Sequence, residues 1–211
     1  VVIDKAKGDH TLFSYRGAND NLKIKLPSRI ETHWLYLASL SGKNWLNQLN
    51  RVKQICQKQK IKLAFNPGAL QIEGGINKLK NILKLTRVLI VNKSEATKLV
   101  LSKKPKSFKE LPVKKLLQIL FSFGPQIIAI TEGKAGAYAY DGKKFFSSPA
   151  RANLKVIDTT GAGDAFSGGF LASLIQQKSL PTALKNGIKN GESVVIKLGA
   201  QEGLLFKHNL F

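Results

Sequence analysis

The pattern that points most directly to chemistry lies at residues 158–166, which read Asp-Thr-Thr-Gly-Ala-Gly-Asp-Ala-Phe. Residues 155–157 before it predict a short strand, and apolar residues recur after it at helical spacing. The glycines therefore lie in a turn that leads from a strand into a helix. Because the first N–H groups of a helix lack intrahelical partners and carry partial positive charge, the backbone of Gly161, Ala162 and Gly163 can hold an anion.

Asp164, at the start of the same helix, has two interpretations. It can cap the helix N-terminus, which is a common use of aspartate. It can also act as a general base that takes the proton of an incoming hydroxyl group. Donors preorganised around a transferring phosphoryl group stabilise its charge, and here the turn, the anion site and the acid occur together. The pattern therefore favours phosphoryl transfer with Asp164 as the base.

Asn92 and Glu95 follow a predicted strand at residues 87–91. Side chains three residues apart on a helix point to the same side, so these two can act on one ligand. A capping box, in which the two residues only satisfy the helix start, explains the same spacing.

Thr131, Gly133 and Gly136 follow another predicted strand, at residues 126–131. Glycines at this point would allow a ligand to approach the backbone closely. An ordinary turn into a hairpin explains the same residues.

The elements that must position these motifs alternate between strand and helix along most of the chain. This alternation predicts an α/β fold with a mainly parallel sheet and helices on both faces. In such sheets ligands collect outside the carboxyl ends of the strands, so the motifs above are expected at one site. Strands are expected at residues 34–38, 61–65, 87–91, 126–131, 136–140 and 143–147, and helices at residues 44–58, 77–85, 113–123 and 181–198.

The length of 211 residues suits one domain with a substantial core. The single cysteine, Cys56, cannot form an internal disulfide and is expected to fill the core from an apolar helix face. No apolar run approaches the roughly 20 residues of a membrane-spanning helix. The N-terminus also lacks the regions of a signal peptide, so a cytoplasmic location is expected.

The formal net charge of +21 predicts long-range attraction to nucleic acid, anionic membranes and nucleotides. The lysines are interleaved with leucines in a helical rhythm, which is typical of solvated helix faces. No zinc-finger spacing, basic zipper or RNA-recognition aromatic pair accompanies them. We therefore expect neither a specific nucleic-acid partner nor a membrane partner.

Residues 158–170 resemble the C-terminal signature of the PfkB family of carbohydrate kinases, the ribokinase-like group. The resemblance implies a ribokinase-like three-layer sandwich over residues 1–211. It also implies that Asp164 activates a sugar hydroxyl and that Gly161, Ala162 and Gly163 form an anion hole. No Gly-x-x-x-x-Gly-Lys-Ser/Thr pattern occurs, so a P-loop kinase is disfavoured.

The same resemblance extends to the other motifs. Asn92 and Glu95 resemble a family motif that orders Mg²⁺, its waters and the phosphates. Residues 197–203 resemble a loop that flanks the base and helps to hold a monovalent cation such as K⁺, a role that Asp158 would share. ATP and Mg²⁺ are therefore the implied cofactors, with K⁺ as a further candidate. The implied nucleotide-binding residues are Asn92, Thr131, Gly133, Gly136, Gly161 and Gly163.

The resemblance begins part-way into the family pattern, so the chain is expected to lack the N-terminal strand and the acidic residue that holds the sugar. Residues 1–30 are then expected to form strands of a small β lid, and residues 31–211 the α/β core. Tyr15 and Arg16 are expected near the sugar, and a homodimer formed through the lid is a candidate assembly. The expected site is one whose phosphate half is present and whose sugar half is mostly absent, so this polypeptide alone is expected to lack the sugar-phosphorylating activity of a full-length relative.

The predicted function is transfer of the ATP γ-phosphate to a hydroxymethyl oxygen of a sugar. A nucleoside kinase of the same fold stays an open alternative. The residues that would discriminate between a sugar and a nucleoside belong mostly to the segment expected to be absent. A basic binding protein that kept the fold without catalysis is a third interpretation, against which the intact Asp164 and anion loop argue.

Overall fold

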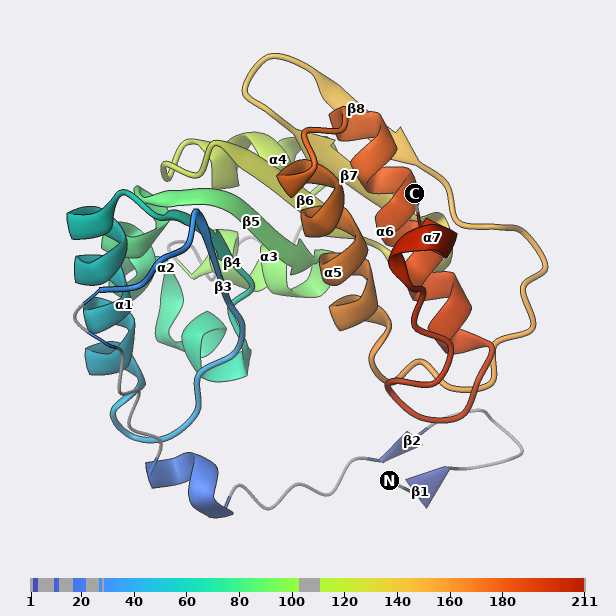
Figure 1. Cartoon of the computed structure of the whole chain (residues 1–211), viewed down its shortest axis with the longest axis horizontal. Coiled ribbons are helices and arrows are strands. Elements are labelled where there is room, and N and C mark those ends of the chain that lie inside the picture. Colours follow the sequence, from blue (N-terminus) through green and yellow to red (C-terminus); the bar gives the residue numbers. More distant parts are fainter. Residues whose placement is uncertain are drawn as a thin grey trace.

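Six strands form the central sheet in the described part of the chain, which comprises residues 2–3, 10–11, 17–21, 27, 29–102 and 111–210 of a computed structural model (Figure 1). Four neighbouring strands run parallel, and the last two add antiparallel at one side. The carboxyl ends of the parallel strands therefore meet at one edge of the sheet. In spatial order the strands are β3 (Trp34–Leu37), β4 (Lys62–Phe65), β5 (Thr86–Asn92), β6 (Ile127–Thr131), β7 (Ala137–Tyr140) and β8 (Phe145–Ser148).

Helices cover both faces of the sheet, which confirms the predicted three-layer α/β sandwich (Figure 1). One buried cluster joins α1 (Trp45–Gln59), α2 (Ala69–Leu83), α3 (Lys93–Leu101) and α4 (Val113–Phe121) to one face. A second cluster joins α5 (Ala162–Ile175) and α6 (Leu180–Val195) to the opposite face. The smaller elements are β1 (Val2–Ile3) and β2 (His10–Thr11), which pair antiparallel in a separate sheet, η1 (Gly17–Asn21), η2 (Gly133–Ala135) and α7 (Lys207–Leu210).

Helix α1 forms as the apolar spacing predicts. Leu49, Val52 and Cys56 lie three or four residues apart and are at most 3% exposed, so one face of α1 is fully buried. The prediction that Cys56 fills the core is confirmed. Burial raises the pKa of the Cys56 thiol, which disfavours the reactive thiolate.

Helix α2 starts eight residues before its predicted start, at Ala69 rather than residue 77. Gly75 interrupts it with a left-handed φ of 75°, and the next N–H group, of Ile76, donates to the Ser102 hydroxyl over 3.2 Å. The pair of glycines at positions 74 and 75 concealed the first half of α2, because glycine weakens a helical pattern.

The strand predicted at residues 155–157 is wrong, because this segment pairs with none of the strands that the structure describes. The backbone N–H groups of Ile157 and Asp158 instead donate to the carbonyl of Val195 over 2.8 Å and 3.2 Å. Since Val195 is the last residue of α6, that helix also ends earlier than the predicted residue 198. The segment therefore reaches α5 as an extended loop attached to the end of α6.

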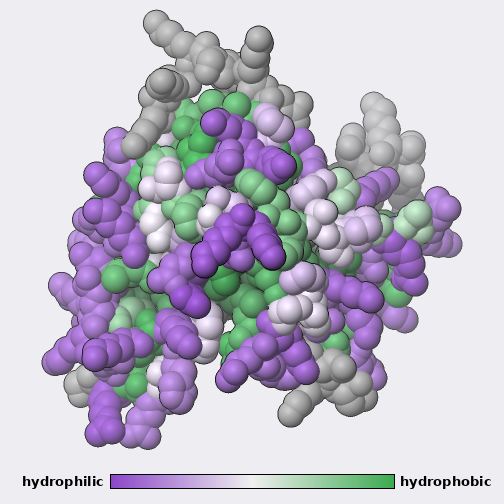
Figure 2. All heavy atoms as spheres, turned by 90° about the horizontal axis from the view of Figure 1, so that it is seen from above, coloured by the Kyte–Doolittle hydropathy of each residue, from purple (hydrophilic) through white to green (hydrophobic). Residues whose placement is uncertain are grey.

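The outer surface carries many charged side chains. Figure 2 shows hydrophilic side chains around most of the outline, whereas hydrophobic atoms concentrate toward the middle of the visible face. Lys78 and Lys80 on α2, and Lys114 and Lys115 on α4, are all exposed, as solvated helix faces predict. Within the described residues, none of the helices combines the length and apolar character needed to cross a bilayer.

Candidate active site

Asn92 and Thr131 lie side by side at the carboxyl edge of the sheet. They are the last residues of β5 and β6 and are direct partners in the parallel register. Asn66 follows the last residue of β4, and its N–H group donates to the carbonyl of Leu37, the last residue of β3, over 2.9 Å. The polar motifs that follow the strands in sequence are therefore brought to one edge.

The loop that enters α5 packs against the C-terminal loop at residues 197–203. Gly161 is the N-cap of α5 with a left-handed φ of 80°, and a Cβ there would lie 2.4 Å from the carbonyl oxygen of Ala200. Asp158 joins the same two loops, since Oδ1 accepts from the N–H of Thr160 at 2.9 Å and Oδ2 from that of Gly199 at 3.0 Å. The two loops form one unit in which only glycine fits at position 161.

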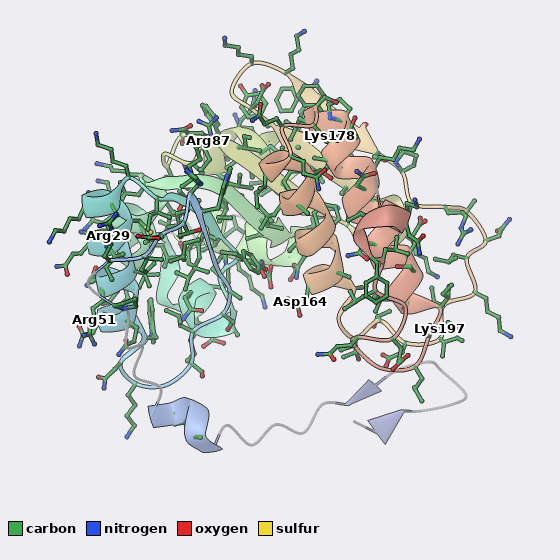
Figure 3. All side chains as sticks on the ribbon, in the orientation of Figure 1. Arg29, Arg51, Arg87, Asp164, Lys178 and Lys197 are labelled. Carbon is green, nitrogen blue, oxygen red and sulfur yellow. The ribbon has the colours of Figure 1, made fainter. Side chains whose placement is uncertain are left out.

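Asp164 lies in the first turn of α5 and is exposed. Figure 3 shows it at the N-terminal end of α5, on the side of this helix that faces α3. Because Gly161 holds the N-cap position and no side-chain hydrogen bond caps α5, the interpretation of Asp164 as the cap is wrong. The Ala162 N–H donates to the carbonyl of Thr159 over 3.2 Å, whereas a Cβ at Gly163 would meet nothing within 4 Å, so the backbone is open at Gly163. An anion can therefore reach the turn that carries Asp164.

Tyr36, on β3, belongs to the same part of the site and was not predicted from the sequence. Its hydroxyl donates to Oδ1 of Asn66 over 3.4 Å. Burial raises the pKa of Tyr36 above 10.0, a hydrogen bond with the Ser167 side chain lowers it, and the negative charge of Asp164 raises it. Tyr36 is therefore close to the first turns of α5. In the sequence it stands among apolar strand residues, and no local signal distinguishes it from a core residue.

Asn92 and Glu95 form a capping box at the start of α3. Asn92 Oδ1 accepts from the Glu95 N–H, and Glu95 Oε2 accepts from the Asn92 N–H, both over 2.9 Å. Burial raises the pKa of Glu95, although the hydrogen bonds from Asn92 and the charge of Lys98 oppose the shift. The capping box is confirmed as local structure. A role for the pair in metal binding stays a prediction, and burial of the carboxylate favours a nearby cation.

An ion pair connects the segments that follow β5 and β6. Nζ of Lys93 lies 2.6 Å from Oε1 of Glu132, and both side chains are mostly buried, with 28% and 24% of their surface exposed. Lys93 directly follows Asn92, and Glu132 directly follows Thr131. The ion pair therefore fixes the spacing between the two motifs at the carboxyl edge.

The glycines that follow Thr131 differ in what surrounds them. A Cβ at Gly136, whose φ is 96°, would lie 2.2 Å from the carbonyl oxygen of Ser148, so the hairpin requires this glycine. A Cβ at Gly133 would meet nothing within 4 Å. The turn into the hairpin therefore accounts for Gly136, whereas Gly133 presents open backbone to a ligand.

An open cavity of about 430 Å³ lies beside the loop that enters α5. Apolar atoms of Leu154, Ile157 and Ile196 contribute to its lining, together with Arg151 and Asn153. One of the lining residues, Ile157, directly precedes Asp158 in the sequence.

The residues at this edge fit a Mg²⁺ ion that is shared with a ligand rather than held by the protein alone. Within the described ranges, no group of three or more His, Cys, Asp or Glu side chains could hold a metal ion. Mg²⁺ usually keeps several waters and binds one or two carboxylates together with phosphate oxygens, which suits Glu95. Tyr15 and Arg16, expected near a sugar, lie outside the described residues.

Comparisons with known proteins agree with this arrangement. A model of the pfkB family of carbohydrate kinases matches residues 1–206. An uncharacterized sugar kinase from Archaeoglobus fulgidus is 28% identical over 207 residues, which cover 97% of this chain and 78% of that relative. A cytidine kinase from Thermococcus kodakarensis is 27% identical over 182 residues, which cover 84% of this chain and 60% of that relative.

Solved structures show the same fold. A ribokinase from Thermotoga maritima superposes with a TM-score of 0.76 at 23% identity, covering 99% of this chain and 66% of its own. Arabidopsis thaliana ribokinase, complexed with ribose and ATP, has a TM-score of 0.70 at 18% identity. The match covers 84% of this chain and 54% of that protein. Phosphofructokinase-2 from Escherichia coli, in complex with potassium, has a TM-score of 0.67 at 21% identity and the same coverage, 84% and 54%. The chain thus spans between 54% and 66% of these solved proteins.

Proposed function

Because the chain belongs to the PfkB family of carbohydrate kinases, we propose that it transfers the γ-phosphoryl group of ATP to a hydroxyl group of a sugar. The observation that carries the proposal is the first turn of α5, where the exposed Asp164 stands beside the open backbone of Gly163. A carboxylate and open backbone within one helical turn support the proposal, because phosphoryl transfer to an alcohol requires a proton acceptor beside an anion site.

In the proposed reaction, Asp164 takes the proton of the acceptor hydroxyl as its oxygen attacks the γ-phosphorus. The bond between that phosphorus and the bridging oxygen of ADP breaks, so the products are ADP and a sugar phosphate. The amides of Gly161, Ala162 and Gly163 stabilise the negative charge on the transferring group, and the Ala162 N–H, which donates to the Thr159 carbonyl over 3.2 Å, is shared with it.

The nucleotide would extend from the start of α5 across the carboxyl edge of the sheet. The open backbone at Gly133, beside Thr131, allows the phosphates to come close. The open cavity beside Ile157 offers apolar side chains together with Arg151 and Asn153, which suits a nucleobase. Bound Mg²⁺ would neutralise phosphate charge, and Glu95 with Asn92 would orient it, directly or through water.

A nucleoside is the second candidate acceptor. The match to a cytidine kinase covers 84% of this chain, and the exposed ring of Tyr36 near Asp164 could pack against a nucleoside as well as a sugar. Sugars and nucleosides both offer a primary hydroxyl group to Asp164, so the mechanism is the same for the two classes.

The proposal is tested by measuring ADP formation with ATP, MgCl₂ and a panel of pentoses, hexoses, sugar phosphates and nucleosides. We expect at least one sugar to stimulate ADP formation well above the rate with water alone. Replacement Asp164→Asn should lower kcat by about 100-fold or more and leave ATP affinity within about twofold, because it removes a base and keeps the shape. Glu73→Gln, at an exposed position of α2, is the control for loss of one negative charge.

Two results would contradict the proposal. One is a wild-type protein that binds ATP but phosphorylates no member of the panel. The other is an Asp164→Asn variant that turns over as fast as wild type, which would assign proton removal to another group. Phosphorylation of nucleosides alone would select the second candidate acceptor.

A further inference from the structure

Tyr36 has a location that its part in the fold does not explain. It lies on β3, which pairs only with β4 in the described sheet. Side chains alternate along a strand, and Leu35 and Leu37 pack into the cluster under α1 to α4. Trp34 packs into the opposite cluster, under α5 and α6, so Tyr36 points to that side as well.

Tyr36 is nevertheless not part of that core. Tyr36 is 42% exposed, whereas Phe166 and Phe170, the aromatic residues of α5, are 4% and 0% exposed. A tyrosine ring left this open contributes little to the core and offers an apolar face to a ligand. The exposed ring also lies close to Asp164, whose charge acts on the phenol.

The environment of the phenol hydroxyl is polar and rigid. Nδ2 of Asn66 donates to the carbonyl of Ile90 over 2.8 Å, so its Oδ1 is held toward Tyr36. On the other side, the hydroxyl of Ser167 donates to the carbonyl of Gly163 over 2.8 Å. Ser167 follows Asp164 by three residues, so both lie on the same side of α5.

Tyr36 interacts with two side chains, Ser167 and Asn66, and the hydrogen bond that it donates to Asn66 is long. At 3.4 Å it exceeds the 2.7–2.8 Å that is usual for O–H···O bonds, so the hydroxyl can still donate to a better-placed acceptor. Burial and the Asp164 charge raise the pKa of Tyr36, which keeps the phenol protonated and able to donate at neutral pH.

We propose that Tyr36 binds the alcohol acceptor, its ring packing on the acceptor's C–H face and its hydroxyl donating to an acceptor oxygen next to the one that Asp164 deprotonates. This inference rests on the proposed function, and it assigns the acceptor side of the site to β3 and the Asn66 loop. The ligand is a polyhydroxylated molecule with a flat apolar face, such as a furanose. Ser167 and Asn66 act through Tyr36 as positioning residues.

The first test is Tyr36→Phe, which removes one oxygen and keeps the ring. With D-ribose and with cytidine as acceptors, we expect KM for the acceptor to rise about tenfold, which corresponds to one lost hydrogen bond. KM for ATP should change less than twofold. The matched control is Tyr138→Phe, which makes the same change on β7, where the ring packs under the opposite layer of helices. If Tyr36→Phe lowers the melting temperature and leaves KM for both acceptors unchanged, Tyr36 has only a structural role and the inference is overturned.

The second test does not depend on turnover. In protein labelled with ¹³Cζ-tyrosine, the Tyr36 signal is the one that disappears in Tyr36→Phe. Titration with D-ribose or cytidine should move this signal in a saturable way and leave the signal of Tyr138 unchanged. In Asp164→Asn, the Tyr36 signal should titrate at lower pH than in wild type, because the nearby negative charge is gone.

The two proposals fail in different ways. A wild-type protein that phosphorylates nothing in the panel contradicts the kinase proposal, and a Tyr36 signal that moves with D-ribose would still support the acceptor site. A Tyr36 signal that neither compound moves overturns the inference, even if the protein proves to be an active kinase.

Discussion

Lys93, the first residue of α3, and Glu132, which follows β6, form an ion pair of 2.6 Å. The register pairs Asn92 with Thr131, so the ion pair lies one residue beyond the last paired residues of two parallel strands. It holds the start of α3 against the turn after β6, at the point where the nucleotide phosphates are proposed to lie. Its charges are largely shielded from water, so salt should screen it less than an exposed pair.

Breaking this ion pair should weaken nucleotide binding more than it weakens the fold. We expect Glu132→Gln and Lys93→Met each to raise KM for ATP severalfold and to lower the free energy of unfolding by about 1–2 kcal/mol. The double variant should lose less than the sum of the single variants, with a coupling energy of about 1 kcal/mol. This double-mutant cycle is measured by urea unfolding and ATP kinetics on wild type, the two single variants and the double variant. Strict additivity would show that the two side chains do not interact.

Gly161 and Gly163 should respond oppositely to alanine. At Gly161 the φ of 80° and the approach to Ala200 forbid a Cβ, so Gly161→Ala should destabilise the protein by about 2 kcal/mol or more. At Gly163 nothing lies within 4 Å, and alanine favours a helix, so Gly163→Ala should leave stability unchanged or raise it by about 0.5 kcal/mol.

At Gly163 alanine should impair catalysis although it leaves the stability of the protein intact. If the Gly163 amide faces the transferring phosphoryl group, the added methyl of Gly163→Ala should raise KM for ATP or lower kcat by about tenfold or more in a fully folded protein. Urea denaturation and steady-state kinetics measure the two effects separately. A Gly163→Ala variant with wild-type kinetics would remove this glycine from the anion hole.

The layers of the fold could be predicted because buried parallel strands are short, continuous apolar runs. The segments at residues 87–91 and 126–131 are of this kind, and β5 and β6 form there. The segment at residues 155–157 has the same local character, yet the end of α6 takes its N–H groups. A local pattern does not show which partner a backbone will find, and this difference made the strand prediction wrong.

The phosphate side of the candidate site could be predicted because its residues are contiguous in sequence. The turn, the helix start and Asp164 all lie within residues 158–166. Tyr36 could not be predicted, because its proximity to Asp164 depends on how α5 packs across the edge of the sheet. The distinction between Gly133, which faces open space, and Gly136, which the hairpin requires, likewise depends on contacts that the sequence does not contain.

Asp158 is proposed to contribute to a monovalent cation site in addition to joining two loops. Asp158→Asn should lower the free energy of unfolding by about 1 kcal/mol, because an amide replaces a carboxylate that accepts two backbone N–H bonds. Asp141→Asn is a matched control, since Asp141 accepts from the N–H groups of Lys143 and Lys144 in the hairpin turn.

Only the variant at position 158 should change the response to K⁺. We expect KCl to stimulate wild-type turnover more than NaCl at equal ionic strength, and this difference should disappear in Asp158→Asn and persist in Asp141→Asn. Equal stimulation by K⁺ in all three proteins would limit Asp158 to a structural role.

Glu95 should make the stability of the protein depend on pH. Burial raises its pKa above the ordinary value near 4.5, so the native state binds this proton more tightly than the unfolded chain does. The stability associated with Glu95 is therefore fully present below about pH 4.5 and is lost as pH rises through the folded pKa. Glu95→Gln carries no charge at any pH and can still accept from the Asn92 N–H group. Its free energy of unfolding should therefore fall less than that of wild type between pH 4 and pH 8.

Glu95→Gln should also raise the MgCl₂ concentration that turnover requires. If Glu95 orients Mg²⁺, Glu95→Gln should need about tenfold more MgCl₂ for half-maximal turnover, although its stability should fall less toward pH 8 than that of wild type. Glu73→Gln controls for the removal of one negative charge from a chain whose net charge is already +21. Urea unfolding at several pH values and MgCl₂ titration of the kinase rate measure the two effects. A smaller fall in stability without any change in the MgCl₂ requirement would show that Glu95 serves only the capping box, and the metal would then need other ligands at this edge of the sheet.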